Sequence, residues 1–453
     1  MIDLKLILFA MAFGEMALTG FSANENGNKS KKELPNIVII YADDMGYGDV
    51  GYHGVDDILT PNIDKLAKSG VYFTQGYVSA SICSPSRCGL LTGVYQQRFT
   101  NGQNARDKDP LVELFKKQPM ISEILKPLGY SSGIIGKWHL GEEESLRPNN
   151  RGWDYFYGFL NGSHSYFKAT KKFTKNKDFW PIFRNNEMVD FEGYATEVFT
   201  NEAINFILRN NSSISGRPFL LYVAYNAVHF PWEVPDKYIQ RVSFIKNQNR
   251  RLFAGMVLAM DDGVGRILET LNKEGLEENT IVIFISDNGS PRGQLGDMSS
   301  TGPLRGWKGD CFEGGIRVPF IIKWPGQIQP GIRYDKPVIN LDILPTLAEF
   351  IGLKKIDRYH FDGVNILPYL KGEKQPDETP HENLFWRRGK DMAIRHGDWK
   401  LVVEYSGDNH NPMLFNLTND IGERKNLITV YPEKAKELQT IYELWENSLP
   451  EIR

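Results

Sequence analysis

The sequence predicts an α/β protein: a large, mixed but mostly parallel sheet sandwiched by helices, followed by a smaller C-terminal subdomain of antiparallel strands and a helix. Three observations predict it. Four short apolar runs are of the type that forms strands buried on both faces. Amphipathic helical patterns separate these runs, which favours parallel pairing. Near residue 370 this alternation gives way to short runs typical of antiparallel strands, followed by a closing amphipathic helix. A chain of 453 residues with 41% apolar content is long enough for one large core or for two domains.

The strands of the main sheet are expected where apolar, β-branched runs end in polar residues. The first covers Asn36 to Tyr41, and the later ones fall within residues 132–141, 218–229 and 280–290. Helices are expected at "TPNIDKLAKSG" (60–70) and "FAGMVLAMDDGVGRILETLNKEG" (253–275), which have apolar residues at helical spacing. Short antiparallel strands are expected within 381–405 and 412–420, and a closing amphipathic helix within 431–449.

The N-terminal residues read as a secretory signal. Lys5 precedes the run "LILFAMAF", and small residues lead to a cleavage site near Ala23. An ordinary apolar N-terminus is the alternative, since Glu15 interrupts the run. The uninterrupted run is well short of the ~20 residues that span a bilayer, so we expect no stable membrane insertion. The predicted organisation is a signal peptide at 1–23, a catalytic α/β domain at 24–369 and a C-terminal subdomain at 370–453. The net charge of −3 gives no support for a nucleic-acid partner.

Polar, chemically capable residues follow each of the four main strands directly. Open α/β sheets place their ligands at the carboxyl ends of the strands, so these residues should meet at one edge of the sheet. The residues are Asp43, Asp44, Lys137, His139, His229, Asp287 and Asn288. Taken singly, each has a more ordinary interpretation, because Asp-Asp and Asp-Asn-Gly are common in turns and a lone histidine is more often structural.

The stretch "SICSPSRCGLLTG" places Cys83 at the expected start of a helix. Pro85 suits the first turn, and Ser84 is a candidate cap. The helix N-terminus and Arg87 favour an anion, which predicts a nucleophile with a lowered pKa. A disulfide to Cys88 is geometrically feasible but would strain the helix start.

This same stretch resembles the signature of the type I sulfatases, C-x-P-S-R-x-x-x-L-T-G, without a departure from Cys83 to Gly93. The resemblance extends from about Asn36 to Leu401 and includes "ADDMGYGDVGYHG", "GKWHLG", "SDNGS" and "PLRGWKGDCFEGGIRVPFIIKWPG". It implies an alkaline phosphatase-like fold, and the segments "HENLFWRR" and "AIRHGDWKLV" are similar to sulfatases of bacterial systems that degrade polysaccharides and glycosaminoglycans.

The resemblance implies a cofactor set and roles for individual residues. Cys83 would be oxidised to Cα-formylglycine by a formylglycine-generating or anaerobic sulfatase-maturating enzyme, so that one hydroxyl of the hydrated aldehyde attacks sulfur and the other expels sulfate. Carried over by position, the remaining roles are as follows: one Ca²⁺ held by Asp43, Asp44, Asp287, Asn288 and residue 83; Lys137 and Lys308, with the permanent charge of Arg87, balancing negative charge; His139 as base; His229, with Lys308, as acid; and His164 as a sugar ligand. Trp232 is a candidate for stacking on a sugar or for packing, and Arg151 and Arg305 are candidates for binding carboxylates or sulfates or for supporting loops.

The implied function is hydrolysis of a sulfate ester on a carbohydrate, in exo fashion on oligosaccharides released from polysaccharides, in the periplasm or outside the cell. Two alternatives are a phosphonate or phosphate ester hydrolase of the same superfamily and a non-catalytic glycan-binding relative. Asn288 after Asp287 favours the sulfatase, since phosphate-acting relatives tend to carry histidine there. All expected positions are filled, which argues against a non-catalytic protein.

Overall fold

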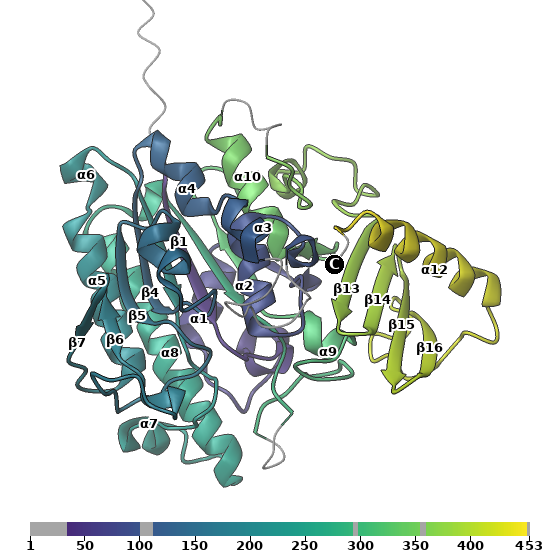
Figure 1. Ribbon diagram of the computed structural model, residues 1–453, viewed down its shortest axis with the longest axis horizontal. Helices are drawn as coiled ribbons and strands as arrows, with labels where there is room; N and C mark the ends of the chain where they lie inside the picture. Colours follow the sequence, from purple (N-terminus) through teal and green to yellow (C-terminus); the bar gives the residue numbers. More distant parts are fainter. Residues whose placement is uncertain (1–33, 100–111, 293–297, 354–358, 451–453) are drawn as a thin grey trace, which may run out of the picture. The chain divides into compact units, whose positions relative to one another are not determined.

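The computed structural model describes residues 34–99, 112–292, 298–353 and 359–450. A ten-stranded mixed sheet forms its centre (Figure 1). Its strands, in spatial order, are β11 (Ile332–Tyr334), β2 (Val71–Phe73), β10 (Phe320–Lys323), β9 (Thr280–Ser286), β1 (Asn36–Ala42), β8 (Phe219–Ala224), β4 (Ser131–Lys137), β5 (Tyr155–Phe159), β6 (Ile182–Arg184) and β7 (Glu187–Val189). The four strands expected from the apolar runs are β1, β4, β8 and β9, and they occupy the middle of this sheet.

The middle of the sheet is parallel, as the alternation of strands and helices predicts. β9, β1, β8, β4 and β5 run in one direction, whereas β10 is antiparallel to both β9 and β2. The β1–β9 register pairs Ala42 with Ser286, the last residue of each strand. The residues that follow these two strands are therefore brought side by side at the same edge of the sheet.

Helices cover both faces of the sheet, so the central strands are buried on both sides. In β1, Val38 and Ile40 join one core cluster while Ile37 and Ile39 join the other, which is the alternation expected of a pleated strand. The first face is covered by α1 (Pro61–Lys68), α5 (Ala195–Arg209), α7 (Asp236–Arg241) and α8 (Gln248–Lys273). The second is covered by α2 (Cys83–Thr92), α3 (Val112–Lys117), α4 (Ile121–Leu125), α10 (Ile343–Phe350) and α11 (Leu367–Leu370).

Short elements occupy the connections between these larger ones. Two further single-turn helices are α6 (Ser212–Ser215) and α9 (Glu313–Ile316), and a two-stranded sheet pairs β3 (Gly76–Tyr77) with β12 (Val338–Ile339). The 3-10 turns are η1 (Tyr47–Asp49), η2 (Gly51–His53), η3 (Gln96–Arg98), η4 (Lys126–Leu128), η5 (Glu144–Leu146), η6 (Pro148–Arg151), η7 (Lys177–Phe179), η8 (Glu277–Asn279) and η9 (Asn340–Asp342).

The C-terminal part is a four-stranded antiparallel sheet with one long helix lying across it (Figure 1). The elements are β13 (Asn383–Arg388), β14 (Asp391–His396), β15 (Trp399–Ser406), β16 (Asn409–Asn416) and α12 (Pro432–Asn447). The fold class predicted from the sequence is confirmed in both parts: the mostly parallel sheet between helices and the antiparallel sheet with its helix.

The C-terminal sheet shares its hydrophobic core with the main domain. Trp386 and Leu414 pack in one cluster with Tyr77, Phe312 and Ile339, which belong to the main part of the chain. Residues 34–453 accordingly form one compact unit. The architecture therefore changes near residue 370, but the parts before and after it share a hydrophobic core.

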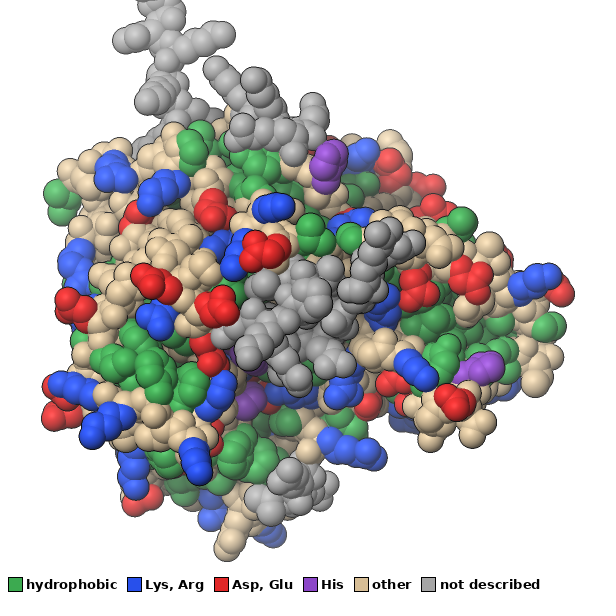
Figure 2. Space-filling model, viewed as in Figure 1, with side chains coloured by type: hydrophobic (Ala, Val, Ile, Leu, Met, Phe, Trp, Pro, Cys, Tyr) green, Lys and Arg blue, Asp and Glu red, His purple; other side chains and the backbone are tan. Residues whose placement is uncertain are grey.

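The predicted signal peptide at 1–23 lies outside the described residues. In the part of the chain that the structure describes, we find no helix with both the length and the apolar character needed to cross a bilayer. On the face drawn in Figure 2, acidic and basic side chains are interspersed over the surface.

Candidate active site

Three carboxylates meet at the carboxyl ends of β1 and β9. Asp43 and Asp44 follow β1, Asp287 follows β9, and all three are buried. Oxygens from the three groups lie within 4.8 Å of one another, and the backbone N–H of Asp44 donates to Oδ1 of Asp287 at 3.1 Å. The convergence predicted from the strand ends is therefore realised by the parallel pairing of β1 and β9.

The oxygen donors of this cluster suit a hard divalent cation. Oδ1 of Asp43 and Oδ1 of Asn288 are buried without a hydrogen-bond partner among the described residues. A buried acceptor without a hydrogen-bond partner destabilises the folded protein. A cation bound to these oxygens would remove that cost in free energy. Burial, and next the charge of Asp43, raise the pKa of Asp287 to about 7, so an added positive charge would favour its ionised form. Carboxylate and amide oxygens are the donors that Ca²⁺ prefers.

Cys83 is the first residue of α2 and lies next to this cluster. Its Sγ is within 4.8 Å of donor atoms of Asp43 and His229. The helix begins without a side-chain cap after Ile82, and every residue of α2 is buried. The predicted cap at Ser84 is wrong, because the helix starts one residue earlier and Ser84 lies inside its first turn.

The expectation of a lowered thiol pKa at Cys83 is also wrong. Burial raises the pKa of Cys83, and although Lys137 and Lys308 oppose that shift, Asp43 and Asp287 add to it. An unmodified thiol at this position is therefore a poor nucleophile at neutral pH. All three cysteines of the chain are free, so the Cys83–Cys88 disulfide is not formed.

Arg87 connects the helix to the acidic cluster. It lies one turn into α2 and is fully buried. Its Nε and Nη2 donate to Oδ2 of Asp287 at 3.1 and 2.8 Å, and Nη1 donates to the carbonyl of Lys137 at 3.2 Å. The side chain is fully engaged by protein groups, so it fixes the position of Asp287 relative to α2.

Two lysines pair with neighbouring carboxylates of the cluster, one with Asp43 and the other with Asp44. Nζ of Lys137, the last residue of β4, lies 2.5 Å from Oδ2 of Asp43. Nζ of Lys308 lies 2.6 and 2.9 Å from the two carboxylate oxygens of Asp44. Although burial would lower the pKa of Lys308, Asp44 raises it above its usual value, so this lysine stays protonated. The charges of Lys308, His229 and Lys137 in turn outweigh burial and hold the pKa of Asp44 well below its usual range.

His139 is fixed by a backbone conformation that is uncommon for its residue type. Its φ is 57°, and its N–H donates to the carbonyl of Leu160 at 3.0 Å. A Cβ at Gly162 would come within 2.6 Å of Cε1 and Nε2 of its ring, so only glycine leaves room for the imidazole there. Burial and the charges of Lys137 and Arg87 lower the pKa of His139 well below 6.5. The ring is therefore neutral and able to accept a proton.

His229 approaches the cluster from the loop after β8. Its Nδ1 lies 2.6 Å from the carbonyl of Phe230, which orients the ring, and its Nε2 lies 3.8 Å from Oδ2 of Asp44. Burial and Lys308 lower the pKa of His229 to about 3, although Asp44 opposes the shift. The side chains of His229 and Lys308 are 16% and 20% exposed, and His139 is likewise only partly buried.

Three of the four predicted substrate contacts are held by structural partners instead. Both ring nitrogens of His164 face backbone carbonyls, of Ser165 at 2.6 Å and Trp180 at 2.9 Å, and the residue is fully buried. Arg151 is 2% exposed and donates to the carbonyl of Gln118. These positions correct the prediction for both residues, because neither side chain is accessible to a substrate.

Arg305 is likewise committed to the C-terminal part of the chain. Its Nη1 donates to the carbonyl of Glu423 at 2.9 Å, and its guanidinium lies 3.9 Å from the ring centroid of Phe312. Trp232 is different, since it is partly buried against the main core and follows His229 on the same loop. Substrate binding by Arg305 is therefore not supported, whereas the role of Trp232 stays a prediction.

Sequence reasoning missed two residues that position the site. Gly162 packs against His139, and Arg388 of β13 donates to the carbonyl of Gly309 at 2.7 Å, next to Lys308. The backbone N–H groups of Lys308 and Gly309 donate to the carbonyls of Ser290 and Ser81. No local pattern in the sequence signals these contacts, because each joins residues distant in the chain.

The fold and the site together define an ester hydrolase with an alkaline phosphatase-like architecture, in which carboxylates at strand ends surround a residue at a helix start. Comparison with known proteins narrows this class. The family model "Sulfatase" matches residues 35–353, and the model "N-sulphoglucosamine sulphohydrolase, C-terminal" matches residues 307–449.

Individual relatives agree with the family models. The N-acetylgalactosamine-6-sulfatase of Mus musculus is 32% identical over 86% of this chain and 81% of its own length. "Uncharacterized sulfatase YdeN" of Escherichia coli K12 is 29% identical over 96% of this chain and 89% of its own. The crystal structure of Ps i-CgsB with k-i-k-neocarrahexaose superimposes with a TM-score of 0.82 at 35% identity, covering 91% of this chain and 92% of that one. The chain belongs to the sulfatase family and is a sulfuric ester hydrolase.

Proposed function

We propose that this sulfatase removes sulfate from a sulfated carbohydrate, with Cα-formylglycine formed from Cys83 and one bound Ca²⁺. The observation that carries the proposal is the buried cluster of Asp43, Asp44, Asp287 and Asn288 beside Cys83, with two acceptor oxygens that lack partners. The raised pKa of the Cys83 thiol supports the modification, because the unmodified side chain would be a weak nucleophile.

The four acidic and amide residues, with residue 83, would hold the cation. When present, the cation polarises a sulfate oxygen, and the hydrated aldehyde supplies one hydroxyl to attack sulfur and a second to release sulfate. The protein's own groups do the remaining work. Lys137 and Lys308, which pair with Asp43 and Asp44 in the cluster, would offset the negative charge that builds on the ester oxygens.

We assign proton transfer to the two histidines. His139 is only partly buried, its Nδ1 is buried without a hydrogen-bond partner among the described residues, and its lowered pKa keeps the ring neutral, so a ring nitrogen could accept a proton from a hydroxyl at residue 83. His229 is neutral at its lowered pKa, so the proton that the leaving alcohol takes up would come from the protonated Lys308 beside it, or from His229 once a bound anionic ester raises its pKa. Arg87 keeps the acidic cluster and the helix start in fixed relative positions.

A terminal sugar of an oligosaccharide is the proposed substrate. The carboxylates are buried and only His139, His229 and Lys308 of the surrounding basic groups are partly exposed, which suits a group presented at a chain end. A carbohydrate is supported by similarity to an N-acetylgalactosamine-6-sulfatase and to a structure solved with a neocarrahexaose. The apolar N-terminal run supports a periplasmic or secreted location, where such glycans are met.

Two measurements test the proposal. Mass spectrometry of the peptide that carries Cys83, from protein made in its native host, should find an aldehyde or its hydrate. Sulfate release from a panel of defined sulfated oligosaccharides should be lost in Cys83→Ala and kept in Cys88→Ala, which removes the neighbouring thiol. An intact thiol at 83 in fully active protein would refute the mechanism. Faster cleavage of a phosphate ester than of a sulfate ester with the same leaving group would favour the phosphate alternative.

A further inference from the structure

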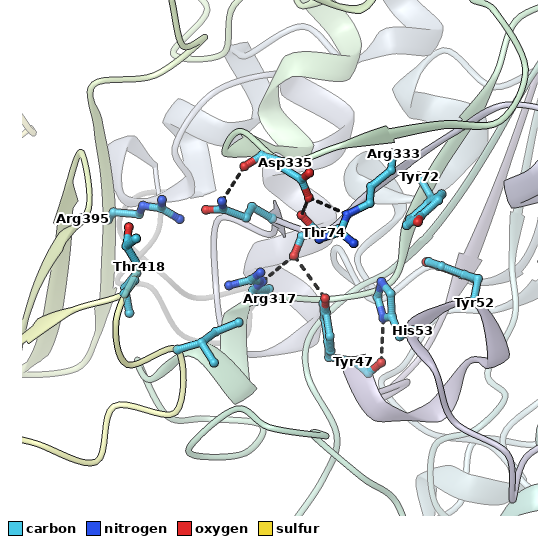
Figure 3. A pocket seen from close by; sticks show the side chains of 13 residues that line it. Tyr47, Tyr52, His53, Tyr72, Thr74, Arg317, Arg333, Asp335, Arg395 and Thr418 are labelled. Carbon is cyan, nitrogen blue, oxygen red and sulfur yellow. Dashed lines mark hydrogen bonds and ion pairs between the residues drawn. The ribbon is translucent and has the colours of Figure 1, made fainter. Parts of the chain in front are cut away.

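A cavity of about 480 Å³ lies apart from the acidic cluster, between the β11–β2 edge of the main sheet and the C-terminal part (Figure 3). None of its lining residues belongs to the set around Cys83. The lining includes Arg317, which follows α9, Arg333 of β11 and Arg395 of β14, together with several tyrosines. A cavity of this size accommodates a small organic ligand such as one or two sugar rings.

The charge of this arginine pocket is net positive. Three arginines line it together with one carboxylate, Asp335, and a second carboxylate, Glu313, pairs with Arg317 behind the lining. Arg395 is 4% exposed and donates to the carbonyl of Gly397 and to the hydroxyl of Tyr77, and no carboxylate of the described residues lies within ion-pair distance of it. The Tyr77 hydroxyl in turn donates to Glu313 at 2.6 Å, so Arg395 reaches this carboxylate only through that hydroxyl, which leaves it able to attract a further anion.

The other two arginines are held with part of the guanidinium still turned to the cavity (Figure 3). Arg317 donates to the carbonyl of Thr74 at 2.6 Å and to Glu313 at 3.2 Å. Arg333 donates from Nε to Asp335 at 2.9 Å, and its side chain is 63% exposed. Backbone and side-chain partners thus fix the arginines in advance, which reduces the entropy that a ligand must overcome.

Aromatic rings complete the lining. Tyr47 stacks on His53 at 3.7 Å between centroids, and Tyr52 meets Tyr72 edge to face at 5.4 Å. Rings with a polar edge offer both an apolar face and a hydrogen-bonding group. Arginines beside such rings match a ligand that has an oxyanion on an otherwise weakly polar ring, as a sulfated or carboxylated sugar does.

The pocket lies at the same edge of the sheet as the active site. β2 is parallel to β1 through the intervening antiparallel β10, so Thr74 after β2 lies at the edge where Asp43 follows β1. Three strand spacings separate β1 from β2, on the order of 14 Å. A short oligosaccharide is long enough to reach across that distance.

We propose that the arginine pocket binds an anionic sugar unit of the carbohydrate substrate, at a place separate from the ester that is hydrolysed. The inference rests on the proposed carbohydrate substrate. The recognised chemistry is an oxyanion on a sugar ring. Inorganic sulfate has the oxyanion but no sugar ring. Comparing its binding with that of a sulfated sugar therefore shows whether the pocket recognises the ring as well as the oxyanion.

Calorimetric titration of the Cys83→Ala chain, which does not turn over, tests the pocket. The probes are N-acetylgalactosamine 6-sulfate, unsulfated N-acetylgalactosamine and sodium sulfate. The expected result is a second binding site for the sulfated sugar that neither other probe matches. Arg333→Ala should weaken this site about three- to tenfold, since it removes a charged donor that is partly screened by solvent. Asp335→Asn should strengthen it, because it removes the carboxylate that lines the pocket.

Arg241→Ala is the matched control, because Arg241 forms a similar surface pair with Asp262 on α7 and α8. It should leave the second site unchanged, and thermal unfolding should find all variants folded. Equal binding by sodium sulfate, or no response to either pocket substitution, would overturn the inference. Hydrolysis of a small aryl sulfate by the protein without substitutions, made in its native host, reports separately on the proposed function. Absence of that hydrolysis would count against the proposed function, whereas the titration alone decides whether the arginine pocket binds an anionic sugar.

Discussion

Arg87 donates from both Nε and Nη2 to a single oxygen, Oδ2 of Asp287, at 3.1 and 2.8 Å. The same guanidinium lies 3.7 Å from Oδ2 of Asp43. One buried cation therefore holds the helix that carries Cys83 to the ends of β1 and β9. The relative position of residue 83 and the acidic cluster depends on this contact.

Replacing Arg87 by lysine should destabilise the protein although the charge is kept. Lysine cannot present two donors to Oδ2 of Asp287 while also reaching the carbonyl of Lys137. Breaking a buried ion pair costs about 3–5 kcal/mol, and we expect Arg87→Ala to approach that loss and Arg87→Lys to lose part of it. Urea unfolding measures both. Unchanged midpoints in both variants would contradict the structural role.

Removing divalent metal should lower both activity and stability. Without a cation, the three carboxylates depend on Arg87, Lys137 and Lys308 alone for balancing charge. A ligand present at 100 times its Kd stabilises the folded protein by about 2.7 kcal/mol, so added calcium should raise the melting temperature of chelated protein. Asp43→Asn should reduce this response. A chelated protein with unaltered melting and full activity would exclude a metal site.

Gly162→Ala should impair turnover with little effect on substrate affinity. The new Cβ would lie 2.6 Å from the His139 ring, so the imidazole must shift. A displacement of about 1 Å in a reacting group costs on the order of 10²-fold in rate. Gly255→Ala in α8 is the control, since its Cβ would meet nothing nearer than 3.3 Å. Steady-state kinetics measure kcat and KM of both variants. An equal loss of kcat in the two, or no loss in either, would refute the positioning role.

Lys400 should be essential for joining the C-terminal sheet to the main domain. Its buried Nζ lies 2.9 Å from Glu313 and 2.8 Å from Glu423, and burial raises the pKa of Glu423 to about 7. Lys400→Met would leave two buried carboxylates facing each other and should cost about 3–5 kcal/mol. The triple change Lys400→Met, Glu313→Gln, Glu423→Gln should recover part of the loss. Denaturant unfolding distinguishes these outcomes.

Asp261 should give the folded protein a defined dependence on pH. It lies in α8 and accepts from the backbone N–H groups of Asn62 and Ile63 at the start of α1. Burial raises the pKa of Asp261 from 3.8 to about 6, although these hydrogen bonds oppose the shift. The folded state thus binds the proton more tightly than the unfolded chain does. The contribution of the Asp261 proton to the free energy of unfolding is therefore complete below pH 4. As the pH rises to about 6, the protein loses about 3 kcal/mol of this contribution.

Comparison with Asp261→Asn isolates this contribution from those of other groups. The free energy of unfolding of the variant, relative to the unmodified protein, should rise between pH 4 and 6 and then level off. Asp262→Asn, one residue on, removes a carboxylate that pairs with Arg241 on the surface and should lack this profile. A constant difference between Asp261→Asn and the unmodified protein would show that the Asp261 pKa is ordinary.

The parts of the site that lie at strand ends could be predicted from the sequence. Apolar runs locate β1 and β9, and parallel pairing then brings Asp43 and Asp287 together whatever the rest of the chain does. The start of α2 was predicted to within two residues because Pro85 restricts the first turn. These inferences need only local pattern and the direction of the strands.

Other features depend on packing and could not be predicted in this way. Arg151 and Arg305 are charged residues in loops, and only tertiary contacts place one against Phe115 and the other against Phe312. His164 is fixed by two backbone carbonyls, one of them sixteen residues away. The thiol pKa of Cys83 was mispredicted because the helix N-terminus was weighed without the burial that opposes it.

The complete enclosure of α2 bears on when Cys83 could be modified. All ten residues from Cys83 to Thr92 are buried once the chain has closed. An enzyme that converts Cys83 as proposed would need the stretch around Pro85 and Arg87 extended and within reach. Such a conversion would therefore have to precede closure of the chain, and a molecule that folded first would keep its thiol.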